Sequence, residues 1–179
     1  GRTPLYITCR EGHLEIARLL REAGAAIDQA QQNGATPLII ASQNGHLECA
    51  RLLLEAGAAK NQAAADGATP LYVACQNGHP EVARLLLEAG AAVDQANTRG
   101  TTPLFIACQE GHVDIARLLL EAGVAMDQAD EAGATPLYIA CEYGHLECVR
   151  MLLESSAAID QAAGGGWTPL LIACSYGHP

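Results

Sequence analysis

Apolar and polar residues follow one fixed order that repeats along the whole chain. The motif Thr-Pro-Leu occurs six times, each 33 residues after the last and without insertion or deletion, at Thr3, Thr36, Thr69, Thr102, Thr135 and Thr168. A Gly-His pair recurs in the same register, from residues 12–13 to residues 177–178. A constant period of this length is typical of stacked structural repeats and not of a single closed globule.

The first half of each unit predicts a short helix. In the second unit, Thr36 is a good N-cap residue. Pro37 suits the first helical turn, where its missing N–H leaves no hydrogen bond unmade. Apolar residues follow as far as residue 41, and Gly45 ends the helix.

A second helix and a polar finger complete the unit. The second helix begins at His46, and its apolar residues have the i, i+3, i+4 spacing of one buried face: Cys49, Leu52, Leu53 and Ala56. Gly57 is expected just after this helix in the left-handed conformation. The polar stretch at residues 58–68 contains the turn signal Asp66-Gly67 and leads, as a projecting finger, into the next Thr-Pro.

These residues resemble the ankyrin repeat, a helical unit of the same period with the signature T-P-L-H-x-A. The resemblance covers the whole chain, as one domain over residues 1–179 with units that start at residues 1, 34, 67, 100, 133 and, for a partial sixth, 166. It implies an all-α repeat solenoid of stacked helix-turn-helix ankyrin repeats with projecting β-hairpin-like fingers.

The chain departs from the family pattern at a few positions. The signature histidine is replaced in every unit, by Tyr6, Ile39, Tyr72, Phe105, Tyr138 and Leu171. Ser156 stands where earlier units have the glycine that ends the second helix, so it must adopt a left-handed conformation or end the helix differently. Asn61 stands where other units have Asp28, Asp94, Asp127 and Asp160, and it resembles the finger asparagine that hydroxylases modify in some ankyrin proteins.

Composition and charge narrow the classes of partner. The net charge is −10, with 20 acidic and 10 basic residues and no basic face, which argues against nucleic acid. No apolar run approaches the roughly eighteen residues of a membrane span, so membrane insertion is not expected. The 7 cysteines are an odd number and no export signal precedes them. A reducing, intracellular location follows, the cytoplasm first and the nucleus second.

Cysteine and histidine recur with the repeats, which predicts structural roles for them. Cys75 and His79 are four residues apart, but Gly78 places them on different helices, so they do not share a face. The cysteine position recurs as Cys9, Cys75, Cys108, Cys141 and Cys174, with Ser42 in the second unit, and predicts a small buried residue. Each histidine is expected to support the start of its own second helix. Cys141 and Cys148 are the one cysteine pair expected to approach within a unit.

Catalytic templates are missing from the sequence. No glycine-rich phosphate loop of the P-loop or dinucleotide type is present. Acidic residues recur beside arginine, as in Glu15, Arg18 and Glu22, which predicts exposed helix faces with local ion pairs. Catalysis needs unlike groups that converge on one point, whereas a repeat array spaces like groups along a line. The sequence therefore predicts no enzyme, no cofactor and no metal site.

Comparison of the units within this one chain separates framework from variable positions. The second helix reads ARLLLEAG in units two, three and four, whereas the finger tips and the last polar residues of the first helix differ between units. In the ankyrin family these two regions line a concave groove that binds other proteins. The aromatic candidates for the main contacts are Trp167, Tyr143 and Tyr176. The polar candidates are Gln43, Asn44, Gln76, Asn77, Asp66, Arg99, Gln109, Glu110, Glu131 and Glu142.

Three functional interpretations stay open at this point. The first is a protein–protein interaction module, with Glu131 and Glu142 favouring a basic partner. The second is an engineered, consensus-like ankyrin scaffold without a natural partner, against which the irregular core residues Ser42, Cys49 and Met126 argue. The third is a structural spacer within a larger solenoid. Neither end shows a polar cap, so copies could also stack end to end.

Overall fold

The computed structural model describes residues 2–178, and Gly1 and Pro179, the first and last residues of the predicted array, lie outside the described part. These residues form eleven α-helices and one 3₁₀ turn, and no strand is found among them. The chain divides into two compact units, residues 1–92 and residues 93–179. The prediction of one domain over the whole chain stays a prediction, and each unit is described by itself.

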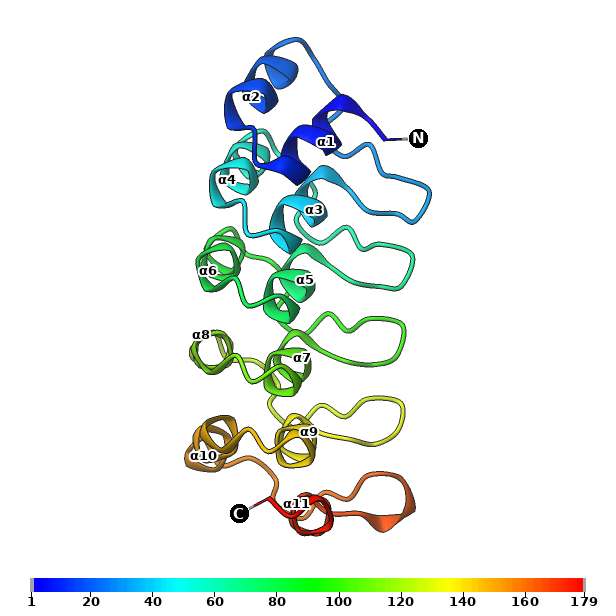
Figure 1. The fold of residues 1–179 in the computed structure, drawn as a ribbon, viewed down its shortest axis with the longest axis vertical. Helices are drawn as coiled ribbons and strands as arrows, with labels where there is room; N and C mark the ends of the chain where they lie inside the picture. Colours follow the sequence, from blue (N-terminus) through cyan, green and yellow to red (C-terminus); the bar gives the residue numbers. More distant parts are fainter. Residues whose placement is uncertain (1, 179) are drawn as a thin grey trace. The chain divides into compact units, whose positions relative to one another are not determined.

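The first unit contains three helix pairs. The first helices of the pairs are α1 (Pro4–Glu11), α3 (Pro37–Gln43) and α5 (Pro70–Gln76), and the second helices are α2 (Leu14–Glu22), α4 (Leu47–Glu55) and α6 (Pro80–Glu88). First helices pack beside first helices, and second helices beside second helices, while each pair also packs together (Figure 1). The fingers project on the side of the first helices.

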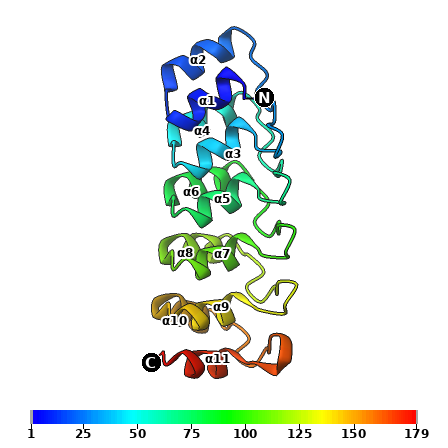
Figure 2. The same cartoon turned by 45° about the vertical axis from the view of Figure 1, so that its right-hand side comes forward.

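The second unit repeats this arrangement. Its first helices are α7 (Pro103–Gln109), α9 (Pro136–Tyr143) and α11 (Pro169–Tyr176), its second helices are α8 (Val113–Glu121) and α10 (Leu146–Glu154), and the 3₁₀ turn η1 covers Gly164–Gly166. The helices α7, α9 and α11 pack side by side, as do α8 and α10 (Figure 2). The predicted helix-turn-helix units are therefore confirmed.

Threonine caps fix where each first helix begins. In all six units the threonine hydroxyl accepts the backbone N–H three residues later, at 3.1–3.3 Å. Proline follows at the first helical position, as predicted. Thr36, Thr102 and Thr135 are completely buried, so the cap also supplies the hydrogen bond that a buried hydroxyl requires.

The histidines join adjacent repeats, and the prediction that each supports its own second helix is wrong. None of the second helices has a side-chain cap from its histidine. Instead, the ring Nε2–H of His46 donates to the Arg10 carbonyl at 2.9 Å, and that of His79 donates to the Gln43 carbonyl at 3.0 Å. His145 and His178 repeat the contact in the second unit. The carbonyls at the end of a first helix have no partner within the helix, and the next repeat provides one.

The same contact explains why glycine precedes each histidine. Gly45 has φ +72°, and a Cβ atom added there would lie 2.6 Å from Nδ1 of His79 in the next repeat. Gly12 meets His46, and Gly144 meets His178, in the same way. Each glycine thus ends its own helix and also leaves room for the histidine of the following repeat.

A side-chain oxygen of Asp or Asn at the base of a finger accepts a hydrogen bond from the backbone of the next finger. Oδ1 of Asp28 accepts the Ala59 N–H at 3.0 Å, and Oδ1 of Asn61 accepts the Ala92 N–H at 2.9 Å. Asp94 and Asp127 accept the corresponding N–H groups of the second unit, both at 2.9 Å. Asn61 makes the same hydrogen bond without a charge, so this contact requires an acceptor oxygen and not a negative charge.

Backbone hydrogen bonds also link the finger tips. Within a finger the chain turns back on itself, as between the Gln31 N–H and the Ala35 carbonyl at 3.0 Å. Between fingers, the Ala65 N–H donates to the Asn33 carbonyl at 2.8 Å, and the Glu131 N–H donates to the Arg99 carbonyl at 3.1 Å. The predicted fingers are therefore tight turns supported by their neighbours.

Ser156 takes the left-handed conformation, with φ 69°, and is the one non-glycine residue with positive φ among residues 2–178. Among the equivalent glycines, Gly24, Gly57 and Gly123 have φ of 79–84° and a Cβ atom added to them would meet nothing within 4 Å. At the fourth, Gly90 with φ 76°, it would lie 3.3 Å from Nζ at the end of the flexible Lys60 side chain. The cost of serine here thus lies in the backbone and not in a clash.

The substitution Asp127→Ala should lower the free energy of unfolding by about 1 kcal/mol, because the Ala158 N–H loses its acceptor. Asp127→Asn should change it by less than about 0.5 kcal/mol, because Asn61 makes the same bond in the first unit. Urea unfolding followed by circular dichroism measures both. Equal losses for the two variants would show that charge, and not the hydrogen bond, is important at this position.

Ser156→Gly should raise the free energy of unfolding by about 1 kcal/mol, because glycine adopts the left-handed conformation without strain. The matched control is Ser155→Gly, at a residue with φ −84° whose hydroxyl donates to the Met151 carbonyl at 2.9 Å. No strain is relieved there, so this variant should be destabilised. Urea midpoints compare the two, and a loss of stability in both would contradict the strain at Ser156.

Candidate protein-binding surface

Three large aromatic side chains are exposed in the second unit. Trp167, Tyr143 and Tyr176 have 44%, 54% and 59% of their surface accessible to solvent. Tyr143 and Tyr176 are the last residues of α9 and α11, and Trp167 follows η1 in the last finger. Each side chain thus lies at one of the two regions, first-helix ends and fingers, where the sequence predicted contacts.

The two tyrosines are held in the same way. The Tyr143 ring stacks on His145 at a centroid distance of 6.3 Å, and the Tyr176 ring stacks on His178 at 6.2 Å. Both histidines are themselves fixed by hydrogen bonds to the preceding repeat. The rings are therefore exposed but already oriented, which reduces the entropy that binding would cost.

Tyr138 and Glu142 extend this aromatic surface. Burial, together with the nearby charges of Glu142 and Tyr176, raises the pKa of the Tyr138 hydroxyl. Glu142 belongs to α9 and Tyr176 to α11, so groups of two adjacent repeats act on the Tyr138 hydroxyl. Tyr138 was not among the predicted candidates.

Three of the polar candidates make hydrogen bonds within the fold. Asn44 Nδ2 donates to the Arg10 carbonyl and Asn77 Nδ2 to the Val73 carbonyl, both at 2.8 Å. Asp66 Oδ1 accepts the Ala68 N–H at 3.0 Å within its finger turn. These polar groups already make hydrogen bonds within the fold, so fewer of their donors and acceptors remain for a partner protein.

The other polar candidates differ in how far they are exposed. Gln109 donates to the neighbouring Glu110 carboxylate at 3.1 Å, and both belong to the end of α7. Gln109 and Glu142 are half-buried, and the exposed members of the set are Gln43, Gln76, Arg99, Glu110 and Glu131. The structure contains no partner, so the binding roles of these residues stay predictions.

Buried thiols from adjacent repeats lie near one another, while the approach of Cys141 to Cys148 within one unit stays a prediction. The thiols of Cys148 in α10 and Cys108 in α7 lie close enough to shift each other's pKa, and so do those of Cys49 in α4 and Cys9 in α1. All four are buried and no cysteine among the described residues is in a disulfide. A second helix therefore contacts the first helix of the preceding repeat through this position.

The raised pKa values of Cys9, Cys75 and Cys108 argue against an activated nucleophile at these three positions. The nearby thiols of Cys49 and Cys148, and burial, raise the pKa of Cys9 and Cys108, and burial alone raises that of Cys75. Such thiols stay protonated at neutral pH and react slowly. The predicted small buried residue is confirmed at Cys9, Cys75, Cys108 and Ser42, whereas Cys141 is half-buried and Cys174 exposed.

Residues 2–178 contain no group of three or more His, Cys, Asp or Glu side chains placed to hold a metal ion. Within the same residues, no helix has the length and apolarity that crossing a membrane would require.

Local ion pairs on the second helices agree with the predicted exposed faces, for example Glu48 with Arg51 at 3.7 Å and Glu147 with Arg150 at 3.9 Å.

Comparison with known proteins agrees with this arrangement. A family model described as ankyrin repeats (3 copies) matches residues 1–64, 57–130 and 122–179. No curated protein matches the chain. Among solved structures, the human ASB11 ankyrin repeat domain is similar over 96% of this chain and 77% of that chain, with 35% sequence identity and a TM-score of 0.89. The predicted repeat solenoid is confirmed, and the chain belongs to the ankyrin repeat family.

Proposed function

We propose that this chain binds a partner protein through its finger tips and the exposed ends of its first helices. Ankyrin repeats are generally protein–protein interaction modules and generally not enzymes. The observation that carries the proposal here is the exposure of three large aromatic side chains, Tyr143, Tyr176 and Trp167, of which the two tyrosines are oriented by stacking on histidines. Large aromatic side chains with polar atoms dominate the binding energy of protein interfaces.

The charge near these side chains favours a basic partner. Glu142 acts on the nearby Tyr138, and Glu131 is exposed at a finger tip. The whole chain carries a net charge of −10. Carboxylates at the rim of an interface mainly set the association rate and the choice of partner, while the aromatic side chains provide affinity.

A reducing compartment, the cytoplasm first, suits this function best. Cys9, Cys49, Cys108 and Cys148 are paired as thiols at the contacts between repeats, and Cys174 is exposed. Free thiols of this kind persist where glutathione keeps cysteine reduced. A partner-free scaffold and a structural spacer are the rival interpretations, and the following measurement separates them from a binding module.

Affinity capture followed by mass spectrometry should recover a specific partner with the intact chain. Trp167→Ala and Tyr143→Ala should each weaken the captured partner's affinity by more than about 1 kcal/mol, because each removes an exposed aromatic anchor. Arg84→Ala, at an exposed residue of α6, is the control and should change affinity by less than about 0.5 kcal/mol. Circular dichroism checks that all three variants fold.

Losses of binding free energy below about 0.5 kcal/mol for both aromatic variants would show that the partner binds elsewhere on the chain. Failure to capture any specific partner would favour the spacer or the partner-free scaffold.

A further inference from the structure

Two pairs of buried cysteines occupy the same place in the two compact units. In the first unit, Cys9 of α1 and Cys49 of α4 lie close enough for each thiol to shift the pKa of the other. Cys108 of α7 and Cys148 of α10 do the same in the second unit. The members of each pair are 40 residues apart in the sequence, so each pair joins one repeat to the next. None of the four belongs to the proposed binding surface.

The packing of the helices keeps the two sulfurs of each pair together. The helix α3 packs on both α1 and α4, and the helix α9 packs on both α7 and α10. All four cysteines are at most 1% accessible to solvent. Side chains in a close-packed interior hold one arrangement, and two groups held side by side react as if each were present at a very high concentration. The fold therefore brings together two thiols that are distant in the sequence.

Packing alone does not require cysteine at the second-helix position. The equivalent residues in the other repeats are Ile16, Val82 and Ile115. Val82 and Ile115 are 1% accessible, so a β-branched apolar side chain fills this position as completely as Cys49 does. At both positions where cysteine replaces it, Cys49 and Cys148, the residue 40 positions earlier is also cysteine. In this chain a second-helix cysteine thus always has a thiol of the preceding repeat beside it.

The two thiols of a pair differ in acidity. The nearby Cys9 thiol lowers the pKa of Cys49, whereas Cys49 and burial raise the pKa of Cys9. Cys148 and Cys108 differ in the same way. A thiolate is the nucleophile toward peroxide, and a neighbouring thiol then condenses with the sulfenic acid that forms. The second-helix cysteine is therefore the attacking thiol, and the first-helix cysteine is the resolving thiol.

We propose that the pairs Cys9 with Cys49 and Cys108 with Cys148 are oxidation sites at which hydrogen peroxide closes a disulfide between adjacent repeats. The Cys49 thiolate attacks one oxygen of the peroxide, the O–O bond breaks, and hydroxide leaves and takes up a proton to form water. The Cys9 sulfur then attacks the sulfur of the Cys49 sulfenic acid. The S–O bond breaks as the S–S bond forms, and the hydroxide leaves with the Cys9 proton as a second water. The two thiols lose two electrons and the peroxide gains them.

The buried position of the thiols makes this reaction depend on opening of the repeats. Peroxide reaches the sulfurs only when the contact between two repeats opens locally, and the disulfide then holds that contact closed. A cross-link restricts the unfolded chain more when it encloses a long loop, so two bonds that each enclose about 40 residues should stabilise the fold. Oxidation thus strengthens the contact between adjacent repeats.

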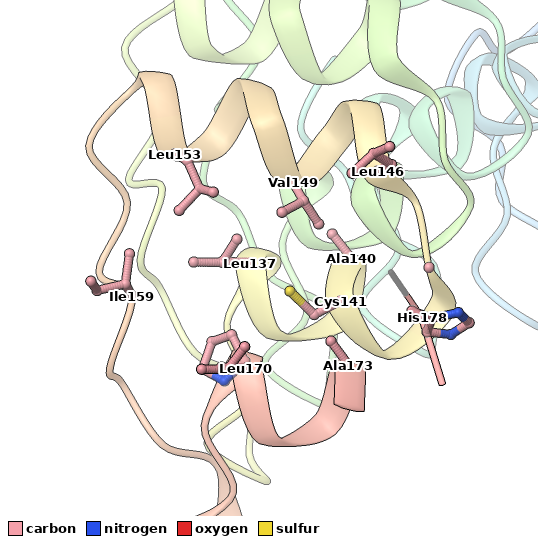
Figure 3. Close-up of a pocket in the computed structure, with 12 residues that line it drawn as sticks. Leu137, Ala140, Cys141, Leu146, Val149, Leu153, Ile159, Leu170, Ala173 and His178 are labelled. Atoms are coloured by element: carbon pink, nitrogen blue, oxygen red, sulfur yellow. The ribbon is translucent and has the colours of Figure 1, made fainter. Parts of the chain in front are cut away.

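Two other cysteines provide controls within the chain. Cys75 is as buried as Cys9, but the residue 40 positions further on is Ile115 and not cysteine. Cys141 lines an open apolar groove between α9, α10 and α11, and Figure 3 shows its sulfur there. The fully buried Cys148 is not among the residues that line this groove. Neither Cys75 nor Cys141 should therefore form a disulfide within the chain.

Peroxide treatment of the intact, reduced chain tests the proposal. Peptide mapping without reduction should find Cys9 linked to Cys49 and Cys108 linked to Cys148, with Cys75 still a free thiol. The midpoint of thermal unfolding should rise by about 5 °C or more and should return to its original value after reduction with dithiothreitol. The exposed Cys174 shows by its own oxidation that the peroxide has acted on the chain.

Cys49→Val removes one pair and introduces the residue that the third repeat has at this position, so this variant should fold, as circular dichroism will show. It should leave Cys9 a free thiol and retain the link between Cys108 and Cys148. Cys148→Val should do the reverse, so each variant is the control for the other. A double variant with both substitutions should show no rise in the unfolding midpoint.

Three results would overturn the proposal. Free thiols at all four positions after Cys174 is fully oxidised would show that the pairs do not react. A link between Cys141 and Cys148, or between cysteines of different pairs, in place of the two expected links would show that other thiols meet first. A midpoint that rises equally in the double variant would show that the stabilisation has another cause.

Discussion

The helices of this protein are too short to be stable alone. They contain seven to nine residues each, whereas an isolated helix of fewer than about 12–15 residues is marginal in water. Each one must therefore be stabilised by packing, and within each compact unit the packing partners are the other helix of the pair and the equivalent helices of the adjacent repeats. Contact between neighbouring repeats is the constraint on which the other features depend.

This constraint explains which features the sequence could predict. The period, the threonine caps, the glycines and the left-handed Ser156 are local properties of one unit, and the structure confirms them. The roles of His46, Asp28 and Cys148 are not local, because their partners lie in another repeat, 31 to 40 residues away. A unit considered by itself suggests that the His46 side chain caps its own helix, and this prediction is wrong. Recurrence marked these residues as structural but could not identify their partners.

The same constraint limits which residues remain for function. Contacts within and between repeats occupy the polar groups of Asn44, Asn77 and Asp66, which the sequence had offered as candidates for binding. The aromatic candidates are exposed as expected, but their stacking on His145 and His178 could not be foreseen, because it depends on where those histidines bond. Tyr138 was missed for a related reason, since its neighbours Glu142 and Tyr176 come from two repeats.

The dependence on neighbours is tested most directly by unfolding one repeat in isolation. A peptide of residues 34–66 contains a complete unit, with α3, α4 and the finger that follows, and can be compared with residues 1–92 and with the intact chain. Circular dichroism during urea titration should show little helix and no cooperative transition for residues 34–66, and cooperative unfolding for residues 1–92. A cooperative transition in the single repeat, with the helix content per residue of the intact chain, would contradict this account.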